Sequence, residues 1–269
     1  MKRAPGPVRQ DPWQTLSSLT SARIGLGRAG GSLPTRALLA FQLAHARARD
    51  AVHRELDAER LAAELVRHGP GVLHLHSAAR DRASFIARPD LGRILDDPSR
   101  IRLEGAAAAG FDLAFIVADG LSAQAVESHA ARLLDAVMPR VKREGWSVAP
   151  LCIVRQGRVA VGDEVGALLQ ARLAVLLIGE RPGLSSPDSL GVYLTHDPLP
   201  GRTNAERNCL SNIRPPEGLS YALAAHKLHY LMGESLRRGL TGVDLKEQAG
   251  DFLPSPSAAG APVDGPGSV

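Results

Sequence analysis

"FDLAFIVADGLSAQAVESHAARLLDAVMPRVKREGWSVAPLCIVRQG", residues 111–157, joins two apolar runs through a long segment of helical periodicity. The runs at 111–120 and 147–157 predict strands, and the second is nearly all apolar, as in strands covered on both faces. Between them the pattern predicts a helix over 123–144, which Pro139 should bend or divide. Strand, helix and strand in this order indicate a right-handed crossover and a parallel sheet.

The same alternation of apolar runs and helical patterns extends in both directions from this unit. Further strands are predicted over 72–77, 173–179 and 190–197. The fold class is therefore α/β, with a Rossmann-like, mostly parallel sheet and helices on both faces, over residues 71–250.

Ligands of such sheets bind beyond the carboxyl ends of the strands. This rule directs attention to "ADG" at 118–120, to "GERPG" at 179–183 and to the loop expected around Cys209. These three segments form the candidate site.

The two ends of the chain differ from this α/β body. An amphipathic helix is predicted from Pro34 to Leu56 and a second helix over 57–68, which together suggest an N-terminal helical domain over 11–70. Residues 251–269 are rich in proline, glycine, alanine and serine, so the sequence predicts a disordered tail that has little to bury.

Composition excludes several classes of protein. The 269 residues carry a net charge of +4 without a basic stripe and interleaved aromatics, so no nucleic-acid partner is expected. No apolar run reaches the length of a bilayer, so no membrane association is expected. Cys152 and Cys209 lie far apart, which favours free thiols and a cytoplasmic location.

"GLGRAG" at 25–30 fits the dinucleotide pattern G-x-G-x-x-G, and Asp50 follows at a suitable distance for a ribose contact. No strand precedes Gly25, however, and Asp50 falls inside a helical pattern. A glycine-rich turn is the preferred interpretation, and a nicotinamide-binding oxidoreductase stays as an alternative.

Other polar residues also have ordinary explanations. His74 and His76 alternate on one predicted strand, yet no nearby cysteine or carboxylate completes a metal site, so no metal is expected. Asp119 follows a strand and would suit a ligand contact, whereas Ser122 more simply caps the next helix. Because G-x-S-x-G, H-E-x-x-H and Walker motifs are absent, no catalytic residue is assigned, and a non-catalytic partner or scaffold protein is a second alternative.

Several blocks taken together resemble the small (light) subunit of ethanolamine ammonia-lyase, in the order expected and over roughly residues 11 to 245. The blocks are "ARIGLGRAGGSLPTRALLAFQLAHARARDAV", "RPDLGR", "ADGLSA", "RQGRVAVGDEVG", "LIGERPGLSSPDSLGVYL" and "RNCLSNIRPPEG".

The resemblance implies an adenosylcobalamin enzyme that converts ethanolamine to acetaldehyde and ammonia by radical rearrangement. It implies a hetero-oligomer in which a large subunit, a TIM barrel on another chain, holds the substrate while the small subunit helps to enclose the cobalamin. Some relatives carry a longer N-terminal extension that addresses them to a bacterial microcompartment. Only about ten residues precede Asp11, so we expect a cytosolic enzyme.

The resemblance also implies three cofactor-binding positions. Val159, in "QGRVAVGD", would contribute shape or a main-chain hydrogen bond. Glu180, in "LIGERPG", would accept hydrogen bonds from the amide side chains around the corrin ring. Cys209, in "RNCLSN", would act by its chemistry or by its size.

Overall fold

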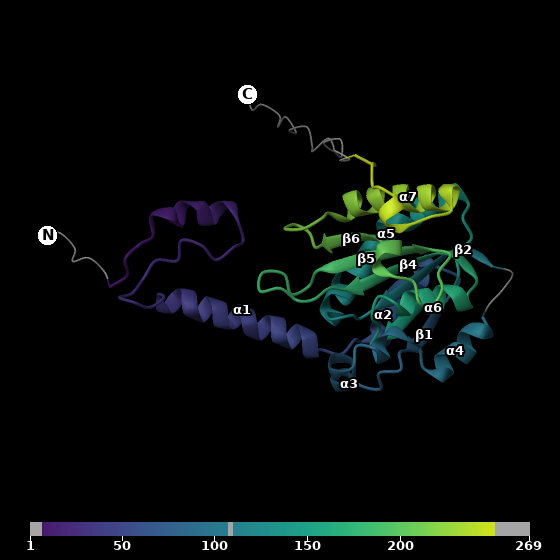
Figure 1. The fold of residues 1–269 in the computed structure, drawn as a ribbon, viewed down its shortest axis with the longest axis horizontal. Coiled ribbons are helices and arrows are strands. Elements are labelled where there is room, and N and C mark those ends of the chain that lie inside the picture. Colours follow the sequence, from purple (N-terminus) through teal and green to yellow (C-terminus); the bar gives the residue numbers. More distant parts are fainter. Residues whose placement is uncertain (1–6, 107–109, 251–269) are drawn as a thin grey trace, which may run out of the picture.

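A six-stranded sheet forms the centre of the computed structural model, which describes residues 7–106 and 110–250 (Figure 1). The strands are β1 Val72–His76, β2 Phe111–Ala118, β3 Leu151–Arg155, β4 Ala171–Gly179, β5 Leu190–His196 and β6 Asn208–Ile213. Their order is β1-β3-β2-β4-β5-β6. The first four strands are parallel, and β5 is antiparallel to both of its neighbours, so β6 again runs with the first four. The predicted α/β class is confirmed, with a mixed, mostly parallel sheet.

The segment around Cys209, which the sequence predicts as a loop, is strand β6. Its sequence, "NCLSNI", buries only Leu210 and Ile213, which is too weak a pattern to predict a strand. The segment becomes a strand because β5 supplies its hydrogen-bonding partners, with Tyr193 opposite Cys209 in the register. The correction makes the position of Cys209 a consequence of sheet pairing.

Helices cover both faces of the sheet. The α-helices are α1 Thr35–His53, α2 Ala58–Leu65, α3 Arg82–Ala87, α4 Asp97–Glu104, α5 Ala123–Glu144, α6 Val161–Leu168 and α7 Tyr221–Arg238. The 3-10 helices are η1 Pro12–Leu19, η2 Val66–His68, η3 Leu91–Arg93, η4 Asn204–Glu206 and η5 Gly242–Asp244. Helices α2, α5 and α7 share one apolar core with the sheet, whereas α4 and α6 share the core on the other face.

Helix α5 has the bounds that the sequence predicts. The Ser122 side chain caps its first turn by accepting from the N–H of Ala125, which confirms the capping interpretation. Gly145 ends it in the left-handed conformation, with a φ of 72°. Pro139 lies inside the helix but does not divide it, because fully buried side chains such as Val137 and Val141 hold both halves in the core.

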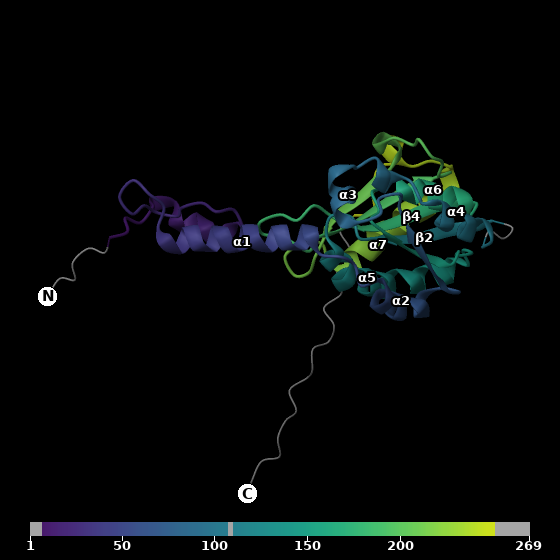
Figure 2. The same cartoon turned by 90° about the horizontal axis from the view of Figure 1, so that it is seen from below.

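The N-terminal part projects from the body as an arm (Figures 1 and 2). Helix α1 has the predicted position, but Ala51 is its only buried residue, and Leu38 and Phe41 on its apolar side are 42% and 41% exposed. Helix α2 instead packs Leu61 and Leu65 into the core of the body. The domain boundaries 11–70 and 71–250 stay a prediction, and the tail predicted over 251–269 lies outside the described residues.

A pH-dependent loss of stability is expected from His129 on α5. Its ring is buried, with Nδ1 2.7 Å from Tyr221 Oη and Nε2 3.6 Å from Asp188 Oδ2. Burial lowers the pKa of His129, Asp188 opposes this effect, and Arg132 adds to it. Below about pH 6.5 His129 is therefore protonated in the unfolded chain more readily than in the folded chain. The contribution of His129 to the free energy of unfolding falls as the pH falls.

The test compares urea denaturation of the wild type and His129→Gln between pH 7 and pH 5. Any stability advantage of the wild type over the variant should shrink as the pH falls, because glutamine does not titrate in this range. Parallel pH profiles for the two proteins would show that His129 makes no such contribution.

Candidate functional site

The candidate site lies at the carboxyl ends of β2, β3 and β4. The chain passes from β2 to β3 on one side of β2 and then crosses to β4 on its other side. The strand order therefore reverses between β2 and β4, which is where α/β sheets open a ligand crevice. Asp119, Val159 and Glu180 all follow strands that end at this edge.

Gly179, the last residue of β4, contacts the loop that follows β2. A Cβ on Gly179 would lie 2.0 Å from Ser122 O and 2.5 Å from Asp119 O, so the loop after β2 crosses directly over the end of β4. The N–H of Leu121 donates to Gly179 O at 3.0 Å. Only glycine permits this approach, and it places Glu180 beside the loop after β2.

A buried ion pair lies beneath the edge, and sequence reasoning missed it. Asp119 is 1% exposed, with Oδ2 3.3 Å from Arg82 Nη1 and Oδ1 accepting from the N–H of Gly157 at 3.0 Å. The same Arg82 nitrogen donates to Gly120 O at 2.9 Å and to Gln156 Oε1 at 3.2 Å. Burial raises the pKa of Asp119 to about 6 and lowers the pKa of Arg82. Because the carboxyl is sealed, it ties the loops after β2 and β3 together and cannot reach a substrate.

The carboxylate of Glu180 is held by β6 and by the residue that directly precedes β5. It accepts from Ser189 Oγ at 2.5 Å, from Ser211 Oγ at 2.5 Å and from the N–H of Asn212 at 3.3 Å. A Cβ on Gly191 would lie 2.9 Å from Glu180 Oε1, so the glycine leaves the space that the carboxylate occupies. A carboxylate has about four acceptor positions, so the fixed group can still accept from a ligand amide.

Cys209 lies on the same face of the sheet as Glu180, and its residue is exposed. Ser211, which bonds Glu180, is two residues further along β6 and therefore points to the same face. Loss of water around the sulfur raises the pKa of the Cys209 thiol, and the charge of Glu180 adds to this effect, against a lowering by the hydrogen bond with Tyr193. Burial likewise raises the pKa of Tyr193 to about 12. Both groups stay protonated near neutral pH, which makes Cys209 a neutral contact surface.

Val159 completes the set. It is partly buried and packs against the core on the α6 side of the sheet, as does Tyr193. The structure thus brings the surroundings of Val159, Glu180 and Cys209 to one face near one edge, although 50 residues of sequence separate the first from the last.

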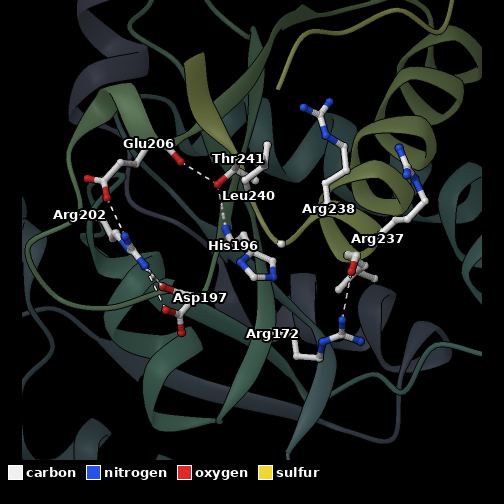
Figure 3. A pocket seen from close by; sticks show the side chains of 11 residues that line it. Arg172, His196, Asp197, Arg202, Glu206, Arg237, Arg238, Leu240 and Thr241 are labelled. Carbon is white, nitrogen blue, oxygen red and sulfur yellow. Dashed lines mark hydrogen bonds and ion pairs between the residues drawn. The ribbon is translucent and has the colours of Figure 1, made fainter. Parts of the chain in front are cut away.

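A hollow of about 610 Å³ lies at the opposite ends of the strands and is lined by none of these residues (Figure 3). His196 lines it and pairs with Leu173 near the start of β4, which places the hollow at the amino ends of the parallel strands. Arg202 bonds Asp197 at 3.2 Å and Glu206 at 2.7 Å, and Arg172 donates to Leu236 O at 3.1 Å. Arg202 and Arg172 are therefore already bonded to carboxylates and to a backbone carbonyl of this chain.

The glycine motif "GLGRAG" and the histidines His74 and His76 lie outside the candidate site. Gly25, Gly27 and Gly30 adopt positive φ in the irregular part of the arm, and no strand lies between residue 7 and Gly25, so "GLGRAG" is not part of a strand–helix unit. His74 lies 3.6 Å from Glu59 and the His76 ring bonds Ser77 O at 2.7 Å. Over residues 7–106 and 110–250, no cluster of three or more histidine, cysteine, aspartate or glutamate side chains is arranged to hold a metal. In the same ranges, no helix combines the length and hydropathy needed for a membrane crossing.

Comparison with known proteins shows the family. The family described as "Ethanolamine ammonia-lyase light chain (EutC)" matches residues 10–246. The chain belongs to this family. Ethanolamine ammonia-lyase small subunits similar to it include those of Ralstonia nicotianae, Azotobacter vinelandii and Pseudomonas fluorescens. The Ralstonia protein is 61% identical over 248 residues, which cover 91% of this chain and 92% of the relative. The Azotobacter protein is 59% identical over 246 residues, or 90% of this chain and 91% of the relative. The Pseudomonas protein is 58% identical over 243 residues, or 89% of this chain and 88% of the relative.

The match to the ethanolamine ammonia-lyase light chain begins in the arm. Its first residue, 10, precedes η1, and its last, 246, follows α7, so the family unit includes both the exposed arm and the α/β body. A function assigned through the family therefore has to account for the exposed arm as well as the sheet edge.

Proposed function

We propose that this chain is the small subunit of an adenosylcobalamin-dependent ethanolamine ammonia-lyase, which converts ethanolamine to acetaldehyde and ammonia. The observation that carries the proposal is the family match over residues 10–246. The position of Val159, Glu180 and Cys209 around one sheet edge supports it. When bound, the cofactor supplies a radical by homolysis of its cobalt–carbon bond.

The residues at the edge suit the outside of a corrin ring. Val159 and the protonated Cys209 offer apolar contact, and the braced Glu180 carboxylate offers an acceptor for a peripheral amide. Cys209 and Ser211 are exposed, so part of this face is open to a bulky ligand. The role of this chain is to bind, orient and shield the cofactor, since the sealed Asp119 and the protonated Cys209 are unsuited to acid–base or nucleophilic work.

A large subunit, a TIM barrel, would hold the substrate. The exposed apolar side chains of the arm support a docking role, because an arm with so little burial gains its stability from a partner. They are Val8, Trp13, Leu16, Leu19, Ile24, Leu26, Leu33, Leu38, Leu39, Phe41 and Leu43. We place the complex in the cytoplasm, in keeping with the free thiols of Cys152 and Cys209.

Replacing Glu180 by glutamine is expected to weaken adenosylcobalamin binding by roughly 1.5 to 3 kcal/mol, the usual scale of a charge-assisted hydrogen bond. Glutamine keeps the shape above Gly191 but removes the negative charge that accepts from the corrin amides. The measurement is a titration of the reconstituted two-subunit complex with cofactor at saturating ethanolamine. The apparent affinity for ethanolamine should change much less, because the other chain holds it.

Glu217→Gln is the matched control, because Glu217 has a largely exposed side chain in the loop after β6. Size-exclusion chromatography should show equal assembly of both variants. An unchanged cofactor midpoint for Glu180→Gln would return this residue to a purely structural role between β5 and β6.

A further inference from the structure

A second hollow, of about 570 Å³, lies at the proposed cofactor edge between α1, α3 and the loop after β4. We call it the arginine hollow, after Arg49, Arg158 and Arg181, which line it together with His45 and His53. Its remaining lining is mostly apolar and includes Ile86, Leu121 and Leu184. Figures 1 and 2 show the loop after β4 beside the C-terminal half of α1, so the arm forms one wall.

The charged side chains that line the arginine hollow are all basic. Among the described residues that line it there is no carboxylate. Burial lowers the pKa of Arg158, and the positive charges of Arg82, Arg93 and Arg181 lower it further, against a smaller opposing effect of Asp119. Like charges gathered without a counter-charge favour an anionic ligand.

Arg158 is held in place before any ligand arrives. Its guanidinium carbon lies 4.2 Å from the centre of the Phe85 ring, and its Nη2 donates to Phe85 O at 3.1 Å. A Cβ on Gly92 would lie 2.7 Å from Arg158 Cγ, so the stem of the arginine fills the space above that glycine. Its Nε is buried beneath this contact, whereas its Nη1 is not among the buried atoms and donates to no described residue. A fixed guanidinium whose Nη1 is unpaired is preorganised for a phosphate oxygen.

The arginine hollow adjoins the cofactor positions along the chain. Arg158 directly precedes Val159, and Arg181 directly follows Glu180. Leu121 lies two residues before the start of α5, so the positive end of that helix dipole lies at the same edge. A ligand that touches Val159 and Glu180 with its ring can therefore place a charged extension among the arginines.

We propose that the arginine hollow binds the phosphodiester of the cofactor's nucleotide tail, with Arg158 and Arg181 contacting the phosphate and the apolar lining contacting the ribose and base. The inference rests on the proposed function and extends it to a part of the cofactor that Val159, Glu180 and Cys209 leave unassigned. A phosphodiester fits because planar guanidinium groups bind phosphate oxygens in pairs, and because the surrounding apolar walls suit a ribose and an aromatic ring.

The test is an equilibrium titration of the reconstituted two-subunit complex with adenosylcobalamin and, separately, with adenosylcobinamide. Adenosylcobinamide keeps the corrin amides and the adenosyl group but lacks the phosphodiester and base. Arg181→Met and Arg158→Met should each weaken adenosylcobalamin binding by roughly 10- to 100-fold and leave adenosylcobinamide binding nearly unchanged. Arg181 is exposed and bonds no other described residue, so its variant carries the test if Arg158→Met folds poorly.

Arg88→Met is the matched control, because Arg88 is exposed, pairs with Asp90 at 2.6 Å and does not line the hollow. It should bind both ligands as the wild type does. Equal weakening of both ligands by Arg181→Met, or no weakening of either, overturns the inference while leaving the proposed function standing. A wild-type complex that binds neither ligand overturns the proposed function and this inference with it. Glu180→Gln, by contrast, should weaken both ligands, because both retain the corrin amides.

Discussion

Neither this chain nor the large subunit is expected to convert ethanolamine on its own, whereas mixing the two with adenosylcobalamin should produce acetaldehyde and ammonia. The loss of turnover should be nearly complete, because the role proposed for this chain is to bind the cofactor, and the described residues at the sheet edge include no group suited to act on the substrate. Asp119 has a pKa near 6 but is sealed beneath the edge, and the thiol of Cys209 stays protonated. Acetaldehyde release, followed with a coupled dehydrogenase, measures the reaction.

The controls separate the proposed function from its alternatives. Nicotinamide dinucleotide in place of adenosylcobalamin should yield no turnover, because "GLGRAG" lies in the irregular part of the arm and not between a strand and a helix. A chain that only scaffolds the large subunit would be dispensable for turnover at high concentrations of large subunit and cofactor. Acetaldehyde formation by this chain alone with cofactor would refute the division of work between the two subunits.

The second large effect concerns the ion pair of Arg207 with Asp163, whose side chains are 3% and 2% exposed. Arg207 also donates to Arg202 O at 2.8 Å and to Asn204 Oδ1 at 2.9 Å, and so joins the start of β6 to the first turn of α6. Arg207→Ala should lower the free energy of unfolding by about 3 to 5 kcal/mol, because Asp163 is left buried without its counter-charge. Urea denaturation of the purified chain, followed by circular dichroism, gives the value.

Arg60→Ala provides the comparison, because Arg60 pairs with Glu64 at 3.4 Å on the surface of α2. Loss of that exposed pair should cost at most about 1 kcal/mol. The double variant Arg207→Met with Asp163→Leu should recover much of the loss, since it removes both charges and retains apolar volume. A single Arg207→Ala variant as stable as Arg60→Ala would contradict the importance of the buried pair.

Much of the body could be predicted because its signals are local. The continuous apolar runs of β2 and β4 and the periodicity of α5 mark elements that neighbouring residues along the chain define. The Ser122 cap and the Gly145 end are likewise local features of the backbone. The six blocks that resemble the family, three of them around Val159, Glu180 and Cys209, identified it correctly, because their order along the chain is itself sequence information.

Partners far apart in the sequence escaped prediction. Strand β6 has a weak pattern of its own and depends on β5 for its hydrogen bonds. Helix α1 has an amphipathic pattern, but only the tertiary structure shows that its apolar side is left exposed on the arm. Periodicity predicts that a face is apolar and does not predict what covers it.

The sequence by itself determined the α/β class, the bounds of α5, the family, and the three residues to examine at the sheet edge. The tertiary structure alone decided that Glu180 is braced from β5 and β6, that Asp119 is sealed by Arg82, and that arginines from three distant segments share one hollow. The physical reason is that helices and strands arise from contacts between near neighbours in the chain. Charge pairing, burial and the shape of a hollow instead depend on segments that only the order of strands in the sheet brings together.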